Sequence, residues 1–477
     1  MIRRIAIAVC IAGFIALARD SAIAQRDDGP AGPVETTVPA EPERKKENAG
    51  EAPSGSAPFS HSKFVPDLSF VLDFSAVARD LEDRKFAALS IPEFMHGPAH
   101  AHEGHGHSHA AMNEKRGFNL NYGELFLFAP VDPYFELTGV LHLSTTGVEI
   151  EEGYFATTCL PYGFQFKGGK FFSGFGRINA QHAHQWDFSE QPLPYLAFFG
   201  AHGINEVGAQ LTWLAPVGFY LLVGGEALQG QNESSFGSEG FQTHAGGTPI
   251  VDATGETASV DIDGSNGPNL YTGFVKTSFD IGDLTVMIGA SAANGTTRIN
   301  HELDEDNQEE GRHAVKAHTW VYGGELTLKY LIDSYRYVSL QGEYLHRLMD
   351  GTRYGLVYDD VSALDVLSVK NLIKEQSGWY AQLAVKPFLR WRFGARYDAL
   401  NLNRVVIDNE TQDTKNDFSR ASAMIEFVPS EFARIRLQYN YDRSRYETVE
   451  EVTRLKTVHE VILQFTMAIG AHGAHAF

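Results

Sequence analysis

Residues 389–398 read Leu-Arg-Trp-Arg-Phe-Gly-Ala-Arg-Tyr-Asp, and their alternation decides the fold class. The odd-numbered positions are apolar or aromatic, and the even-numbered positions are mostly charged: Arg390, Arg392, Arg396 and Asp398. Successive side chains of a β-strand point to opposite faces of the sheet. The stretch therefore predicts a strand with one apolar face and one charged face.

The same alternation over about ten residues recurs along most of the chain. It is clear in residues 320–330, 433–442 and 461–469. A soluble β-sandwich also alternates, with its apolar face turned inward. Strands of about 9–13 residues, however, match the length that a tilted strand needs to cross a bilayer. The pattern favours a transmembrane barrel.

The connections between these segments alternate between short and long, as they do in outer-membrane barrels. Short connections are predicted at 129–133, 158–161, 215–217, 280–282, 332–334, 386–388 and 429–431. Long connections are predicted at 173–204, 229–268, 294–317, 350–376, 400–418 and 444–456, with one exception, a short link at 144–147. With Val65–Ser75 as the first strand, we expect an all-β, antiparallel transmembrane barrel of about 16 strands, which leaves an aqueous lumen.

The start of the chain has the form of a secretory signal. Arg3 and Arg4 precede an apolar run, and Ala22-Ile23-Ala24 fits a cleavage site, so we expect a signal peptide at 1–24. An uncleaved anchor is the alternative, but the run is shorter than the ~20 residues that span a bilayer. Residues 25–63 are rich in Pro, Glu, Gly and Ser, and we expect a disordered periplasmic segment before a barrel at 64–477.

The last alternating segment ends on Phe477. A terminal aromatic residue on an amphipathic strand resembles the signal that the barrel-assembly machinery reads. Together with the secretory signal, it predicts the outer membrane of a Gram-negative bacterium, with lipid and lipopolysaccharide as the surroundings.

Charge and cysteine content narrow the classes of partner. The formal net charge of −21 argues against nucleic acid and is compatible with cationic cargo or with divalent cations bridging acidic loops. Cys10 lies in the expected signal peptide, which leaves Cys159 alone, so no intrachain disulfide is expected.

Three stretches resemble a known family. They are NLNYGELFLFAPVDPYFEL (119–137), GVEIEEGYFATTCLPYGFQFKGGKFFSGFGRINAQHAHQWDF (147–188) and GAHGINEVGAQLTWLAPV (200–217). They are similar to porin-like outer-membrane proteins labelled zinc-regulated outer-membrane receptors. The resemblance implies a barrel and a link to divalent metal. The chain lacks the length for a plug domain with 22 strands, so we expect diffusion rather than energy-coupled uptake.

A histidine-rich stretch is predicted to lie in the first external loop, at 96–109. It contains His96, His100, His102, His105, His107 and His109. Imidazole suits zinc and other divalent transition metals, and histidine-rich tracts are typical of metal binding. We expect weak capture of metal at several sites, with no tightly bound cofactor; a simple soluble spacer is the alternative.

A second histidine-containing stretch falls in the third external loop. In general porins this loop often folds into the lumen and narrows it. By that analogy, His182, His184 and Asp187 are candidates to bind cations in the pore. Equally, they could form a hydrogen-bonded cluster that holds the loop against the wall.

Charged residues of the strands are candidates to line the pore. The basic set is Arg390, Arg392, Arg396, Arg434 and Arg436, and the acidic set is Glu325, Glu343 and Glu426. Opposed rows of charge across a lumen would set its ion selectivity. Mutual pairing that simply solvates the wall is the other interpretation.

These patterns together predict a channel for small hydrophilic solutes and not an enzyme, and the family resemblance implies a link to zinc uptake. The sequence has no G-x-S-x-G, H-E-x-x-H or Walker motif. The runner-up is a barrel that sheathes a multihaem cytochrome in a trans-outer-membrane electron conduit; the haem would come from the partner, because the chain has no C-x-x-C-H. A barrel enzyme is a third class. A homotrimer is common among porins of this size.

Overall fold

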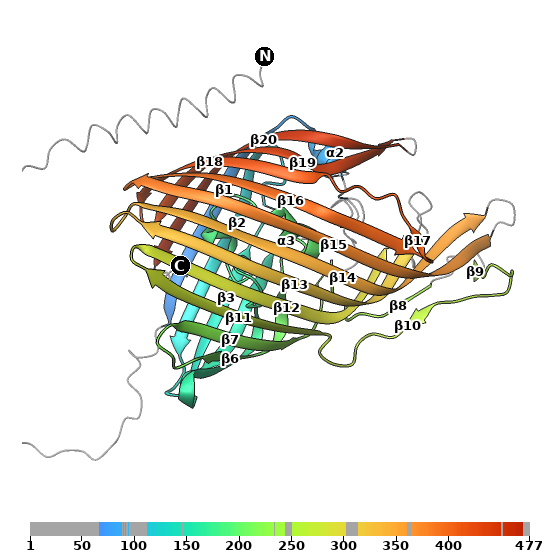
Figure 1. The fold of residues 1–477 in the computed structure, drawn as a ribbon, viewed down its shortest axis with the longest axis horizontal. Coiled ribbons are helices and arrows are strands. Elements are labelled where there is room, and N and C mark those ends of the chain that lie inside the picture. Colours follow the sequence, from blue (N-terminus) through green and yellow to red (C-terminus); the bar gives the residue numbers. More distant parts are fainter. Residues whose placement is uncertain are drawn as a thin grey trace, which may run out of the picture. The chain divides into compact units, whose positions relative to one another are not determined.

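The computed structural model confirms the predicted fold class: the described strands form a closed antiparallel barrel of sixteen strands (Figure 1). The structure describes residues 66–87, 89, 91, 94, 112–145, 147–232, 234–243, 250–301, 313–359, 364–449 and 452–470. The predicted signal peptide, the segment 25–63 and the six histidines between 96 and 109 lie outside these ranges. So does Phe477.

Each barrel strand pairs with its neighbours in the barrel, and β1 closes the barrel by pairing with both β2 and β20. The barrel strands are β1 (Asp67–Arg79), β2 (Gly117–Pro130), β3 (Phe135–Leu143), β4 (Val148–Thr157), β5 (Phe164–Phe172), β6 (Asn205–Leu214), β7 (Tyr220–Leu228), β11 (Leu270–Ile281), β12 (Leu284–His301), β13 (His313–Leu331), β14 (Tyr337–Asp359), β15 (Leu364–Phe388), β16 (Trp391–Ile407), β18 (Phe418–Ser430), β19 (Ala433–Val449) and β20 (Val452–Gly470).

Short elements occupy the connections. They are β8 (Phe241–Gln242), β9 (Ile250–Val251), β10 (Asp261–Ile262), β17 (Glu410–Thr411), the helices α2 (Asp83–Ala87) and α3 (Leu193–Phe199), and the 3-10 turns η3 (Pro161–Gly163) and η4 (Ala183–Gln185). In the described part of the chain, no helix is long and apolar enough to cross a membrane.

Four of the predicted long connections are wrong in extent, because strands continue through them. β14 and β15 have 23 and 25 residues, and their pairing runs to Asp359↔Leu364 inside the predicted loop 350–376. Strands likewise enter the predicted loops 294–317, 400–418 and 444–456. Beyond a bilayer the outer face of a strand no longer needs to be apolar, so the alternation that reveals the strand fades while the backbone pairing persists. The inner face there packs against connections, as Leu356 of β14 and Leu367 of β15 do with Phe241. The first strand also differs, at Asp67–Arg79 instead of Val65–Ser75.

The outer surface of the barrel is apolar where a membrane would surround it. Large exposed hydrophobic residues recur on alternate positions of neighbouring strands, and examples are Leu326, Tyr330, Leu340, Tyr344, Leu383 and Tyr397. In a soluble protein these side chains would be buried, whereas in a lipid bilayer they face hydrocarbon and headgroups. The barrel is therefore of the outer-membrane type.

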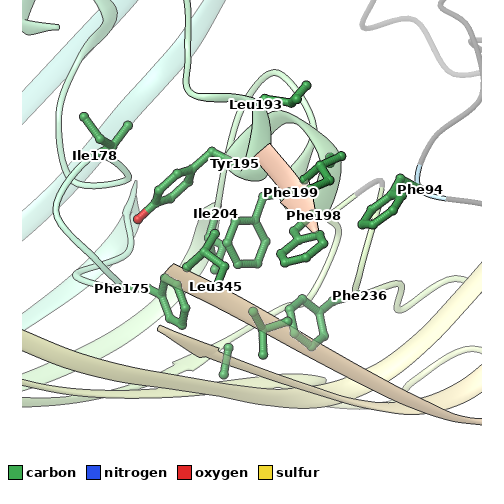
Figure 2. Close-up of a cluster of buried hydrophobic side chains, with 14 of the residues drawn as sticks. Phe94, Phe175, Ile178, Leu193, Tyr195, Phe198, Phe199, Ile204, Phe236 and Leu345 are labelled. Carbon is green, nitrogen blue, oxygen red and sulfur yellow. The ribbon is translucent and has the colours of Figure 1, made fainter. Parts of the chain in front are cut away.

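The long connection 173–204, here called the inner loop, folds into the barrel and carries α3. Six of the seven residues of α3 are buried, and the helix contacts β15 and β16. Its side chains Tyr195, Phe198 and Phe199 gather with Phe175 and with Leu345 of the wall (Figure 2). A hydrophobic core thus occupies part of the space that an open porin would fill with water.

Candidate functional site

Glutamates of β2 and β4 form an acidic wall that faces the inner loop. Glu124 lies on β2, opposite His142 of β3, and Glu149 of β4 pairs with the same histidine. The β3–β4 register shifts between Val140 and Leu141, which pair with residues 152 and 150, so residue 151 has no partner on β3. Such a bulge re-aims side chains next to it. Glu151 and Glu152 of β4, next to this shift, both lie against the inner loop.

The inner loop presents two histidines to this wall. The Nδ1 atom of His182 lies 3.3 Å from a carboxylate oxygen of Glu124 and 3.3 Å from one of Glu151, and its Nε2 atom lies 2.9 Å from Glu152. The Nδ1 atom of His184 lies 3.2 Å from the same oxygen of Glu124. The rings of the two histidines stack, with centroids 5.6 Å apart. We call these five residues the His–Glu cluster.

The cluster is largely shielded from solvent. The side chains of Glu124 and His184 are each 4% exposed, and that of His182 is 13% exposed. Burial alone would lower the pKa of His182, but the carboxylates of Glu124, Glu151 and Glu152 outweigh it and hold this pKa well above its ordinary value. The cluster therefore favours a positive charge at the position of His182.

Part of the cluster has the geometry of a metal site. One ligand atom each from Glu124, Glu151 and His182 lie within 4.8 Å of one another. The buried Nδ1 atom of His182 and the Oε2 atom of Glu151 face each other at 3.3 Å and have no further hydrogen-bond partner within the described chain. A cation bound between them would give each atom a second partner. Imidazole nitrogen and carboxylate oxygen are ligands that zinc accepts in tetrahedral sites, so the residues present fit a divalent transition metal.

The cluster borders a large cavity at the end of the barrel that carries the long connections. The cavity has a volume of about 2040 Å³, and its lining includes Glu124, Glu151 and Ala183. Residues of the connection 80–116 line it as well. We call it the vestibule. An ion in the vestibule would therefore meet two of the potential ligands directly.

Asp187 is not brought to the histidines. Its carboxylate accepts hydrogen bonds from Arg392 of β16 and from Gln382 of β15, at 2.7 Å for the glutamine. The structure thus combines two of the three inner-loop residues proposed from sequence and replaces the third with glutamates of β2 and β4.

The predicted basic row serves the inner loop rather than an open pore. Arg396 donates to the carbonyl of Glu190 at 2.8 Å, Arg434 to that of His184 at 2.6 Å and Arg436 to that of Trp186 at 2.9 Å. Arg420, a residue not proposed from sequence, donates to the carbonyl of Gln191 at 2.5 Å. We call the side of the barrel formed by β14–β19 the arginine wall.

Glu426 neutralises the centre of the arginine wall. It lies 2.7 Å from Arg436, 3.0 Å from Arg392 and 3.5 Å from Arg434. This carboxylate belongs to β18 and pairs with residues of adjacent strands. Glu426 therefore lies within the same wall as the arginines and does not form an opposing acidic row across the lumen.

The remaining predicted pore residues have separate places. Glu343 accepts hydrogen bonds from the backbone N–H groups of Arg177 and Ile178 and from the hydroxyls of Tyr195 and Tyr380, so it anchors the inner loop. Glu325 lies 3.9 Å from Lys276. Arg390 is exposed in the short turn between β15 and β16 and does not line the lumen.

The comparisons with known proteins place the chain in a family. An uncharacterized protein of Aquifex aeolicus (strain VF5) is 46% identical over 421 residues, which cover 88% of this chain and 82% of that protein. The chain belongs to the family of this protein. No family model matches the sequence.

Solved barrels share the general architecture at low identity. The outer-membrane channel DcaP of Acinetobacter baumannii is 10% identical with a TM-score of 0.47, over 86% of this chain and 99% of that one. An anion-selective porin from Comamonas acidovorans is 8% identical with a TM-score of 0.48, over 85% and 100%. OprB of Pseudomonas putida is 10% identical with a TM-score of 0.43, over 86% and 94%.

Proposed function

We propose that this protein is an outer-membrane channel for small hydrophilic solutes that binds a divalent transition-metal ion, zinc above all, inside its barrel. The observation that carries the proposal is the His–Glu cluster, in which one ligand atom each of Glu124, Glu151 and His182 converge within 4.8 Å of one another in a largely buried position. A divalent cation would satisfy these atoms and offset the charge of the carboxylates.

We expect the two histidine-containing regions to bind metal with different strength. The histidines at 96–109 offer imidazole ligands dispersed along the sequence near the predicted external surface, suited to weak capture. The His–Glu cluster offers a small number of converging ligands held by paired strands, and fixed geometry favours tighter binding. Metal captured outside could then pass into the vestibule.

Zinc titration of the purified, folded barrel by isothermal calorimetry tests this proposal. In a background without residues 96–109, we expect one zinc equivalent to bind and His182→Ala to abolish that event. His318→Ala is the matched control, because His318 lies among the outward-facing aromatic residues beside Trp320. Equal zinc binding in the His182 and His318 variants would refute the site.

A cytochrome sheath is the weaker alternative. The inner loop and its hydrophobic core occupy space that a multihaem partner would need. No catalytic role is proposed, because the His–Glu cluster offers no nucleophile. A homotrimer, inserted by the barrel-assembly machinery, is the expected assembly, and the mass of the detergent-solubilised protein by light scattering tests it.

A further inference from the structure

The inner loop has two unlike boundaries with the barrel. Its hydrophobic core draws buried wall residues from β5, β7 and every barrel strand from β11 to β19: Phe171, Leu228, Leu270, Ala293, Val321, Leu345, Tyr380, Leu400, Phe418 and Tyr446. None of the fully buried members comes from β1–β4. Water and ions do not cross a packed apolar core. Any passage beside the inner loop must therefore follow the side formed by β20 and β1–β4, which contributes no fully buried member.

Polar groups continue along that side beyond the His–Glu cluster. Moving along β3 and β4 from the cluster toward the short turns, the next paired residues that point inward are Thr138 and Tyr154. The ammonium group of Lys167, on β5, lies 4.4 Å from the centre of the Tyr154 ring. We call this strip, from Glu124 to Lys167, the polar seam. The end of the polar seam nearest the long connections meets the vestibule at Glu124 and Glu151.

The contacts that close the seam are of a different kind from those on the arginine wall. At the level of the cluster, the loop meets β2 and β4 through His182 and His184, which face Glu124, Glu151 and Glu152. Three carboxylates meet two imidazoles at this boundary, and a single positive charge on His182 leaves the carboxylates repelling one another at short range, where low polarity strengthens the repulsion. A divalent ion ligated by His182 and the glutamates would replace the repulsion by attraction to both partners.

We propose that the polar seam is the permeation path and that the bound metal ion acts as its latch, drawing the inner loop onto β2 and β4. This inference rests on the metal site of the proposed function. Metal binding closes the seam, and metal removal loosens only this boundary, because the arginine wall holds the rest of the loop through bonds that contain no metal ligand. A metal-responsive channel would thereby reduce its own permeability as metal accumulates.

Single-channel conductance in planar bilayers tests the latch with two variants that both lose the metal. His182→Ala removes the imidazole that the three carboxylates share and leaves His184, which pairs with Glu124 among them, so we expect high conductance with or without zinc. Glu124→Gln/Glu151→Gln removes the repulsion and leaves amides that can hydrogen-bond to His182, so we expect low conductance with or without zinc. The wild type should change from high conductance in EDTA to low conductance in zinc. If zinc binds the closed loop more tightly than the open loop by a typical coupling free energy, the mean conductance should fall about tenfold.

If the ion merely plugged an otherwise open seam, the double glutamine variant would instead conduct strongly in both conditions, which would overturn the latch. Zinc binding measured by calorimetry on the same preparations separates the two proposals. Binding to the wild type without any change in conductance rejects the latch and keeps the metal site, whereas no binding rejects both. Heat-modifiable migration on gels confirms that each variant is a folded barrel.

Thiol labelling locates the path independently. In a Cys159→Ser background, Thr138→Cys places a thiol in the polar seam, and Ala293→Cys places one in the hydrophobic core. A charged methanethiosulfonate reagent, added in EDTA, should reduce the conductance of the Thr138 variant and leave that of the Ala293 variant unchanged. The reverse pattern would place the path through the core and contradict the inference.

Discussion

Electrostatic contacts hold the inner loop at both of its boundaries, but the charged groups of the loop and of the barrel differ between the two. On the arginine wall, guanidinium groups donate to backbone carbonyls of the loop, as Arg434 does to His184 and Arg436 to Trp186. On the acidic wall, imidazoles of the loop meet carboxylates. A carbonyl carries no net charge and always accepts, whereas an imidazole–carboxylate contact depends on which cation lies between the partners.

The difference assigns separate tasks to the two sides. The arginine wall also has its own counter-charge in Glu426, so it is neutralised within the barrel. In the His–Glu cluster, three carboxylates surround His182, so the cluster contains more acidic groups than basic ones. The first side should set stability, and the second should set metal response.

The largest effect is expected from Glu426→Gln. It leaves the buried guanidinium groups of Arg392, Arg434 and Arg436 close together without their shared anion, and breaking a buried pair costs about 3–5 kcal/mol. The free energy of unfolding in urea, with the barrel in lipid vesicles, measures this loss. The control is Glu375→Gln at the exposed pair with Arg404, which should cost less than about 1 kcal/mol. Similar losses in both variants would contradict the distinction.

A backbone change should loosen the inner loop itself. Gly176 has a φ of +59°, and an added Cβ would lie 2.0 Å from the hydroxyl of Tyr195 and 2.5 Å from Glu343. Gly176→Ala should cost about 1–3 kcal/mol and raise conductance, since the loop loses its anchor. Gly218, in a short turn with open space around its Cβ position, is the control. An unchanged conductance in Gly176→Ala would show that the loop does not obstruct the lumen.

The metal site should be indifferent to Asp187. Because this carboxylate binds Arg392 and Gln382 and not the histidines, Asp187→Asn should leave zinc affinity unchanged. Calorimetry beside wild type and His182→Ala provides the comparison. A loss of zinc binding as large as that of His182→Ala would restore Asp187 as a ligand and remove the glutamates from that role.

Deleting residues 96–109 should have the smallest effect on the barrel. We expect weak zinc binding events to disappear, while the tight event at the His–Glu cluster and the stability of the barrel remain. Calorimetric titration to high zinc concentration resolves the two classes. Loss of the tight event on deletion would move the principal site to the histidine-rich stretch.

Sequence alternation predicts the barrel because it records the contrast between lipid and water. It predicts residues 389–398 as a strand, and it places the short turns within a few residues. It fails for the ends of β14 and β15 next to the long connections, where the inner face packs against connecting segments and the outer face no longer meets lipid. Strand pairing there depends on backbone hydrogen bonds, which are independent of side-chain pattern.

The His–Glu cluster was half predictable. His182 and His184 stand out in sequence, but their partners Glu124 and Glu151 are 58 and 31 positions away from His182 in the chain. Glu151 also depends on a bulge, which shifts register without any distinctive residue type. Only the folding of the inner loop back onto β2 and β4 makes these residues neighbours. From sequence alone, the nearest acidic residue to the two histidines in the chain is Asp187, which is why it is predicted as the third ligand.

Anomalous diffraction at the zinc absorption edge, from crystals of the full barrel grown with zinc, tests the central claim most directly. The account predicts a strong peak between the Nδ1 atom of His182 and the carboxylates of Glu124 and Glu151. A folded barrel with zinc peaks elsewhere and none at this position would contradict it.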